Sequence, residues 1–202
     1  MPSILVLYDG DNIETRPFTG RFRGLAWDQD GSSLTLVDNA GWVLRIQGGN
    51  GGVSPDTGIT HSLRSVSVNP IDKPALVVCN AGTVIAIKAN GSLTRMNPPT
   101  FENLRSVRWN ANRTMALIAG NNGTLIKYTE HGLETINGGR TNLRGISWRK
   151  NTNRALITSN CFAEEFIRGA HVRQLTEIPD PVEGNPVDSA VKGSQSAVRD
   201  ID

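Results

Sequence analysis

The chain has 202 residues, of which 38% are hydrophobic, and it carries 21 glycines and a net charge of +2. These values suit a folded protein and give no general attraction to nucleic acid or to membranes. No run of about eighteen apolar residues is present, and residues 1–9 lack the features of a secretion signal. We therefore expect a cytoplasmic protein with reduced thiols at Cys79 and Cys161.

Residues 1–21 predict two β-strands that repeat a pattern found further along the chain. A constant offset of 120 relates three pairs: Leu5 and Leu125, Tyr8 and Tyr128, and Ile13 and Leu133. Because the later pair of strands is the second half of a longer unit, we interpret residues 1–21 as half of such a unit.

Four longer segments then match one another. They begin at Phe22, Leu63, Leu104 and Leu143, at spacings of 41, 41 and 39 residues. A period of about forty residues indicates one supersecondary unit per repeat, which cannot bury its own faces alone.

Each unit predicts four strands, which we name A to D in chain order. Strand A alternates apolar and polar residues and ends in tryptophan in three repeats, whereas strand B is continuously apolar, as over residues 75–78 and 116–119. An Asn-x-Gly turn follows strand B in three repeats, at 39–41, 80–82 and 121–123. This is typical of a tight hairpin into strand C, and a weaker strand D ends the unit.

The prediction is an all-β protein, a β-propeller of four-stranded antiparallel blades with about four full blades and an N-terminal half-blade. The predicted division is a half-blade over 1–21, blades over 22–62, 63–103, 104–142 and 143–178, and a flexible tail over 179–202. Strands A and B of the half-blade would come from residues 187–198, from another subunit by self-association, or from a longer propeller. An open strand edge favours association.

Two features of the sequence resemble a known group of proteins. One is the hydrophobic-x-Trp end of strand A, at Trp27, Trp109 and Trp148, and the other is the stretch ALIAGNNGTLIKY at 116–128. They resemble the broad propeller group that includes WD-repeat proteins and photosystem-II stability-factor-like repeats, over about residues 4–178. The resemblance implies the architecture and no particular function. The dipeptide Trp27-Asp28 lies in strand A and not at the end of strand C, so the chain is not assigned to the WD-repeat proteins proper.

One arginine recurs at the start of strand A in every repeat. These residues are Arg23, Arg64, Arg105 and Arg144. In a propeller, equivalent positions surround the axis, and four guanidinium groups would form a ligand site for an anion or an acidic peptide. The alternative is a packing role, in which each arginine pairs with a carboxylate or a carbonyl of the neighbouring blade.

Other recurring residues favour structural roles. We expect Trp27, Trp109 and Trp148 to form the core between blades. His131 and His171 are interpreted as solvated turn residues, and Asp28 and Asp30 as part of the turn between strands A and B. Glu164 and Glu165 fall where the third repeat has Leu125 and Ile126, and we interpret them as the polar face of a terminal repeat.

No catalytic motif, metal-ligand set or cofactor-binding loop stands out, so we expect no cofactor and no metal and lean against an enzyme. The function we favour is a non-catalytic interaction scaffold that binds a protein or acidic peptide through its face loops. The alternative is a glycan-binding propeller with pockets between blades. We expect neither a membrane nor a nucleic-acid partner.

Overall fold

The computed structural model describes residues 3–28, 30–47, 50–51, 57–69, 74–96, 98, 100–150, 152–160, 162–167 and 171–177. Within these residues the chain forms only strands, arranged in one two-stranded and four four-stranded antiparallel sheets. The all-β, bladed architecture expected from the repeat is confirmed. In the described part of the chain, no helix could cross a membrane.

The sheets follow the order of the chain. The first contains β1 (Ser3–Tyr8) and β2 (Ile13–Phe18). The second contains β3 (Phe22–Trp27), β4 (Ser33–Asp38), β5 (Val43–Gln47) and β6 (Asn50–Gly51). The third contains β7 (Leu63–Ser67), β8 (Ala75–Cys79), β9 (Val84–Ile87) and β10 (Leu93–Met96). The fourth contains β11 (Leu104–Trp109), β12 (Ala116–Gly120), β13 (Thr124–Thr129) and β14 (Gly132–Asn137). The fifth contains β15 (Leu143–Trp148), β16 (Ala155–Ser159), β17 (Phe162–Ile167) and β18 (His171–Glu177).

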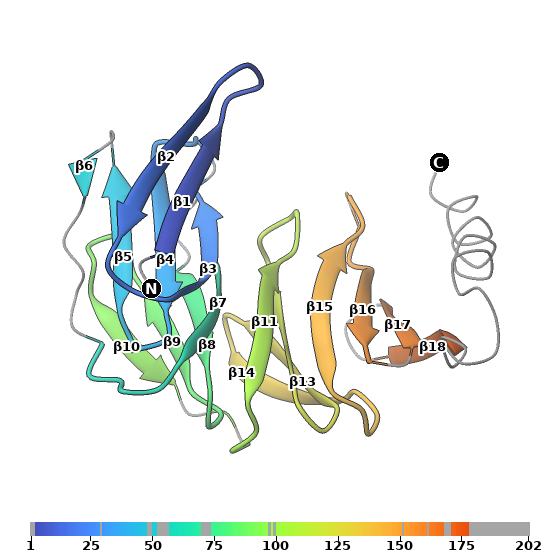
Figure 1. Cartoon of the computed structure of the whole chain (residues 1–202). Helices are drawn as coiled ribbons and strands as arrows, with labels where there is room; N and C mark the ends of the chain where they lie inside the picture. The colour runs from blue at the N-terminus through green and yellow to red at the C-terminus, as the bar shows by residue number, and fades with distance from the viewer. Residues whose placement is uncertain are drawn as a thin grey trace.

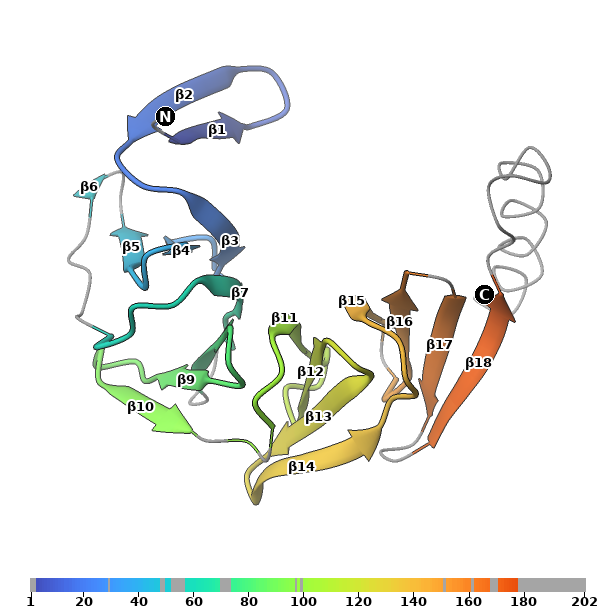
Figure 2. The ribbon, with the colours of Figure 1, turned by 60° about the horizontal axis from the view of Figure 1, so that its bottom comes forward.

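The sheets are arranged as an arc (Figure 1). Figure 2 shows β3, β7, β11 and β15 along the concave side and β6, β10, β14 and β18 along the outer side. We call the four complete sheets blades 1 to 4 and the β1–β2 sheet the half-blade. In each blade the A strand is innermost, and neighbouring A strands contact one another along the arc.

The cores lie between consecutive blades and not within any single sheet. Strand B of blade 3 shows why its sequence is continuously apolar. Ile118 packs toward blade 2, whereas Leu117 and Ala119 pack toward blade 4, and all three are fully buried. A strand covered on both faces needs an apolar side chain at every position.

The turn between strands B and C has the geometry that its Asn-x-Gly sequence predicted. In blade 2, Ala81 and Gly82 both have positive φ, 53° and 65°, as a type I′ turn requires. Gly82 is needed for a second reason, because a Cβ there would lie 1.9 Å from the carbonyl oxygen of Thr100. The turn of one blade is therefore pressed against the connection that leads into the next.

The fourth blade departs from the predicted alignment by one residue. Glu164 pairs with Ile157, just as Ile126 pairs with Ile118 in blade 3. Glu164 and Glu165 therefore occupy the positions of Ile126 and Lys127, and the prediction that placed them at Leu125 and Ile126 is wrong. The turn between β16 and β17 is one residue shorter than the turn between β12 and β13, so strand C of blade 4 is displaced by one position. An alignment of the repeats without gaps could not show this displacement.

The outer face of blade 4 is more polar than the corresponding face inside the arc. Leu156 and Thr158 hold the positions of Leu117 and Ala119, and both are exposed. The residues predicted as a flexible tail, 179–202, lie outside the described part of the chain.

The half-blade packs on blade 1 with one face and leaves the other face open. Leu5 is buried in a cluster with Leu34 and Leu36 of β4, just as its match Leu125 is buried between blades 3 and 4. The opposite face carries large apolar side chains that are 57–70% exposed: Ile4, Val6, Tyr8 and Ile13. The residues matching three of them in blade 3, namely Ile126, Tyr128 and Leu133, pack in the core between blades 2 and 3.

The three recurring tryptophans do not share one environment. Trp109 is buried in the core between blades 2 and 3, and Trp148 is half-buried against the core between blades 3 and 4, as predicted. Trp27 is 51% exposed, so its assignment to the core is wrong. In blade 4, strand β11 of the preceding blade lies beside β15 and contacts Trp148. No described strand occupies the equivalent position beside β3, so Trp27 is left exposed.

Asp28 builds the turn between strands A and B of blade 1. Its carboxylate accepts hydrogen bonds from the backbone N–H of Ser33 at 3.0 Å and from the hydroxyls of Ser32 and Ser33. Asp30 also accepts the backbone N–H of Ser32, at 2.9 Å. These oxygens close the turn, as predicted for this segment.

The Asp28 turn predicts a pH dependence of stability. Burial raises the pKa of Asp28, but hydrogen bonds from Ser33, and then those involving Asp30 and Ser32, outweigh it and lower the pKa to about 2. The folded-state pKa lies below the unfolded value of about 4, so this stabilisation is present above pH 4 and is lost as the pH falls toward 2. We expect Asp28→Asn to lower the urea midpoint at pH 7 and to approach wild type near pH 2. The control Asp11→Asn removes a carboxylate from the exposed β1–β2 turn and should leave the urea midpoint at pH 7 close to that of wild type.

Candidate functional site

A β-bulge places each recurring arginine in an equivalent position. In all four blades the pairing of strands A and B skips one residue, and the skipped residues are Arg23, Arg64, Arg105 and Arg144. A bulged residue leaves the regular ladder, and bulges often re-aim a side chain. The structure thus brings the four predicted site residues to the same point of successive blades.

Each arginine is held by one asparagine of its own blade. The guanidinium Nε donates to the side-chain oxygen of the residue sixteen positions later, at 2.9–3.3 Å. The acceptors are Asn39, Asn80, Asn121 and Asn160. Because the bond uses Nε, the Nη atoms at the tip of the fork remain as donors for a ligand.

The arginines influence one another electrostatically. Partial burial lowers the pKa of Arg64, and the charges of Arg105 and Arg23 lower it further. Among the ion pairs described, none involves the four arginines. A row of like charges without a described acidic partner gives a positive potential that favours an anionic ligand.

Two exposed aromatic residues lie at the same end of the blades. Strand A begins opposite the end of strand B, so the arginines and the B–C turns share one end. Trp42 follows the B–C turn of blade 1 and is 60% exposed, and Phe101 precedes strand A of blade 3 and is 94% exposed. We define the arginine face as the four arginines, their four asparagines, Trp42 and Phe101.

The sequence analysis missed the asparagines and the aromatic pair. The asparagines carried a usable signal, because Asn recurs sixteen residues after Arg in all four repeats. In the alignment of the repeats, Trp42 matches Thr83, Thr124 and Ala163, and no other repeat has an aromatic residue at the position of Phe101, so no repeat pattern marked either residue.

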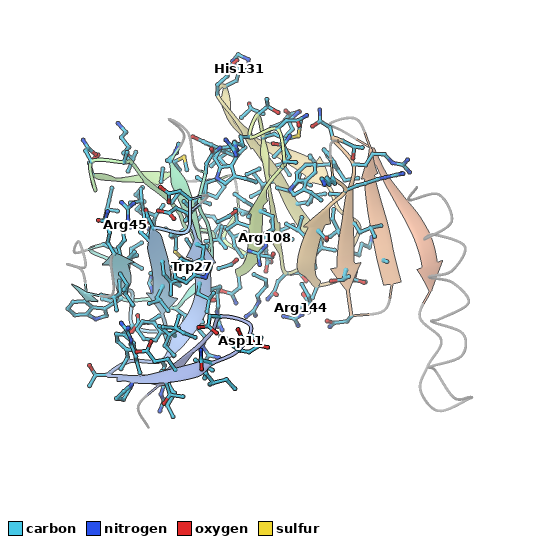
Figure 3. The ribbon with its side chains drawn as sticks, turned by 90° about the horizontal axis from the view of Figure 1, so that it is seen from above. Asp11, Trp27, Arg45, Arg108, His131 and Arg144 are labelled. Atoms are coloured by element: carbon cyan, nitrogen blue, oxygen red, sulfur yellow. The ribbon has the colours of Figure 1, made fainter. Side chains whose placement is uncertain are left out.

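The histidines and thiols add no second site among the described residues. His131 lies in an exposed turn on the outer side of the arc, away from Arg108 and Arg144 (Figure 3). The described part of the chain holds no group of three potential metal-ligating residues. Burial raises the pKa of Cys79 to about 12, so this thiol stays protonated and unreactive in the folded protein. Cys161 and the side chains of His171, Glu164 and Glu165 lie outside what the structure describes.

No model of a known protein family matches the sequence, and no curated protein matches it. The fold is similar to that of virginiamycin B lyase from Staphylococcus aureus, solved as the selenomethionine-substituted protein, with a TM-score of 0.71 at 14% identity. The match covers 88% of this chain and 64% of the lyase chain, so this chain spans less than two thirds of that protein. The lyase is a β-propeller, and the likeness supports the propeller fold alone. The comparisons give no sequence-family support for the WD-repeat or photosystem-II stability-factor group.

Proposed function

We propose that the chain is a non-catalytic interaction scaffold whose arginine face binds an acidic peptide segment of a partner protein. The observation that carries the proposal is the fourfold arrangement in which a bulge releases an arginine and an asparagine fixes its Nε. Preorganised guanidinium groups lose little side-chain entropy on binding and offer paired donors that match a carboxylate.

The exposed aromatics support a peptide rather than a free anion. Trp42 and Phe101 are exposed at the same end of the blades as the arginines, Trp42 after the B–C turn of blade 1 and Phe101 before strand A of blade 3. Aromatic and arginine side chains are the residue types that contribute most to protein interfaces. A peptide that carries both carboxylates and an apolar side chain would use both kinds of contact.

The name of virginiamycin B lyase states an enzymatic activity for that protein. One propeller fold hosts many unrelated functions, and a likeness at 14% identity carries the fold without the activity. The scaffold proposal therefore depends on the arginine face itself.

The double variant Arg64→Gln/Arg105→Gln tests this proposal. We expect it to bind a fluorescein-labelled (Glu-Ser)₅ peptide about tenfold or more weakly in an anisotropy titration, because charge-assisted hydrogen bonds are lost. Wild type should bind the neutral (Gln-Ser)₅ peptide far more weakly than the acidic one.

The matched control is Lys150→Gln, which removes a cationic side chain from an exposed A–B turn at the opposite end of blade 4. Its affinity for the acidic peptide should stay within about twofold of wild type, since a distant surface charge contributes little. If Lys150→Gln weakens binding as much as the double variant does, the arginine face is not the site.

The glycan-binding alternative draws on the exposure of Trp42, since an exposed indole face suits a sugar ring. The interior tryptophans do not favour it. Trp109 is buried, and the Trp148 indole donates to the carbonyl of Arg108 at 3.0 Å. A change of tryptophan fluorescence with any member of a broad sugar panel, abolished in Trp42→Ala, would support the glycan proposal over the scaffold.

A further inference from the structure

One edge of strand β1 is unpaired among the described residues, whereas the equivalent strand of a complete blade is paired on both edges. In blade 3, strand C (β13) pairs with β12 on one side and β14 on the other. The matching strand β1 pairs with β2 alone among the described residues. The backbone N–H and C=O groups on its other edge are available for pairing, which is the usual basis of strand addition.

The apolar side chains of β3 are exposed next to this edge. Leu25 is 55% exposed and Trp27 is 51% exposed. Their counterparts in blade 3, Val107 and Trp109, are 0% and 9% exposed because strands of blade 2 cover them. Leu25 and Trp27 therefore form one side of an interface between blades, and the described structure contains no blade on the other side.

The interior blades show what covers this position. Between blades 2 and 3, the hydroxyls of Ser65 and Ser67 accept the backbone N–H groups of Val107 and Trp109 at 3.4 and 3.1 Å. Between blades 3 and 4, the carbonyl of Arg108 accepts the indole N–H of Trp148. In every case the covering element is the A–B hairpin of the preceding blade.

We infer that the open edge of β1, together with Leu25 and Trp27, is an acceptor site for a β-hairpin of the A–B repeat type supplied by a polypeptide segment outside residues 1–202. The second strand of the hairpin extends the β1–β2 sheet, and its first strand lies beside β3. Its apolar side chains cover Leu25, and one of its carbonyl groups accepts the Trp27 indole. The interface thus continues the series that already joins blades 1 to 4.

Two other sources fit the site less well. A second copy of the chain offers no spare A–B hairpin within the described residues, because each is already paired in its own blade. Residues 178–202 are numerous enough for a hairpin, since β11 and β12 span only 104–120. However, they contain no run of more than two consecutive apolar residues, and strand B requires about four.

A hairpin taken from this chain is the probe. An unlabelled peptide of residues 103–121, which contains β11 and β12, is added to the ¹⁵N-labelled full chain. We expect slowed hydrogen exchange of backbone amides within Ser3–Tyr8 and a shift of the Trp27 indole N–H resonance. A peptide with Leu117→Asp and Ala119→Asp, the two side chains that would face blade 1, should have neither effect.

Two variants of the full chain test the location of the site. Leu25→Asp should weaken peptide binding by roughly tenfold or more, as the loss of one buried apolar contact implies. The control Leu156→Asp, at the exposed outer face of blade 4, should stay within about twofold of wild type. Equal weakening by both variants, or a peptide that leaves exchange and the Trp27 resonance unchanged, overturns the inference.

Protection of the outer edge of β1 in the chain without peptide would also overturn the inference. Protection lost on dilution would mean that a second copy covers the edge. Protection independent of concentration would mean that the chain's own C-terminal residues do so.

Discussion

Gly82→Ala is expected to destabilise the protein by about 3 kcal/mol or more, because two separate costs fall on one methyl group. The first cost is the positive φ of 65°, which an L-residue adopts with strain. The second is steric, since the new Cβ would lie 1.9 Å from the Thr100 carbonyl oxygen and 2.8 Å from its carbon. Backbone atoms cannot rotate away as a side chain can, so the connection into blade 3 must move. Urea unfolding followed by circular dichroism measures the loss.

Gly91→Ala is the matched control in the same blade. Gly91 also has a positive φ, 81°, but a Cβ there would meet nothing within 4 Å. It should therefore cost only the strain of the backbone, about 1 kcal/mol. The difference between the two variants isolates the contact between the B–C turn and the next blade. Equal losses would mean that this contact does not hold the blades together.

Trp109→Ala is expected to cost about 3–5 kcal/mol, as is usual when a large core aromatic is truncated. The indole is 9% exposed and meets the ring of Tyr128 edge to face, with centroids 5.5 Å apart. Trp27→Ala, at the equivalent position of blade 1, should cost less than about 1 kcal/mol, because that side chain is half exposed. Thermal and urea unfolding of the two variants should separate them clearly. Similar losses would contradict the packing described for the arc.

Trp109→Phe refines this comparison. The Trp109 indole N–H is buried and makes no hydrogen bond within the described chain. Phenylalanine retains a ring to pack on Tyr128 and removes a polar group that lacks a partner, so part of the packing loss is offset. We expect this variant to be clearly more stable than Trp109→Ala.

The architecture could be predicted from the sequence because it is repeated. One ambiguous apolar run would have left strand and helix open, but four runs at spacings of 41, 41 and 39 residues, three of them followed by an Asn-x-Gly turn, favour the same unit four times. The match of Leu5 to Leu125 identified residues 1–21 as half of a repeat unit, and both leucines are buried against the blade that follows. The turn geometry also followed, since Asn and Gly are the residues that accept positive φ.

The candidate site was only partly predictable. The recurrence of arginine was visible, whereas the bulge that releases it depends on the pairing of two strands and has no sequence signal of its own. Trp27 shows the opposite case. Its sequence context matches that of Trp109, and its environment differs because of what lies beside β3, which a residue's own repeat cannot show.

The two ends of the arc differ in chemistry, and this difference limits how copies of the chain can stack. At the N-terminal end of the arc, Val6, Tyr8 and Leu25 form an exposed apolar surface. At the other end, the outer face of blade 4 has the exposed Thr158 at the position that Ala119 holds in blade 3. A head-to-tail contact that joined the ends would bury a hydroxyl against hydrocarbon at every junction, and such contacts propagate into filaments when they do not close into a ring. We therefore expect the outer face of blade 4 to disfavour this head-to-tail stacking of chains.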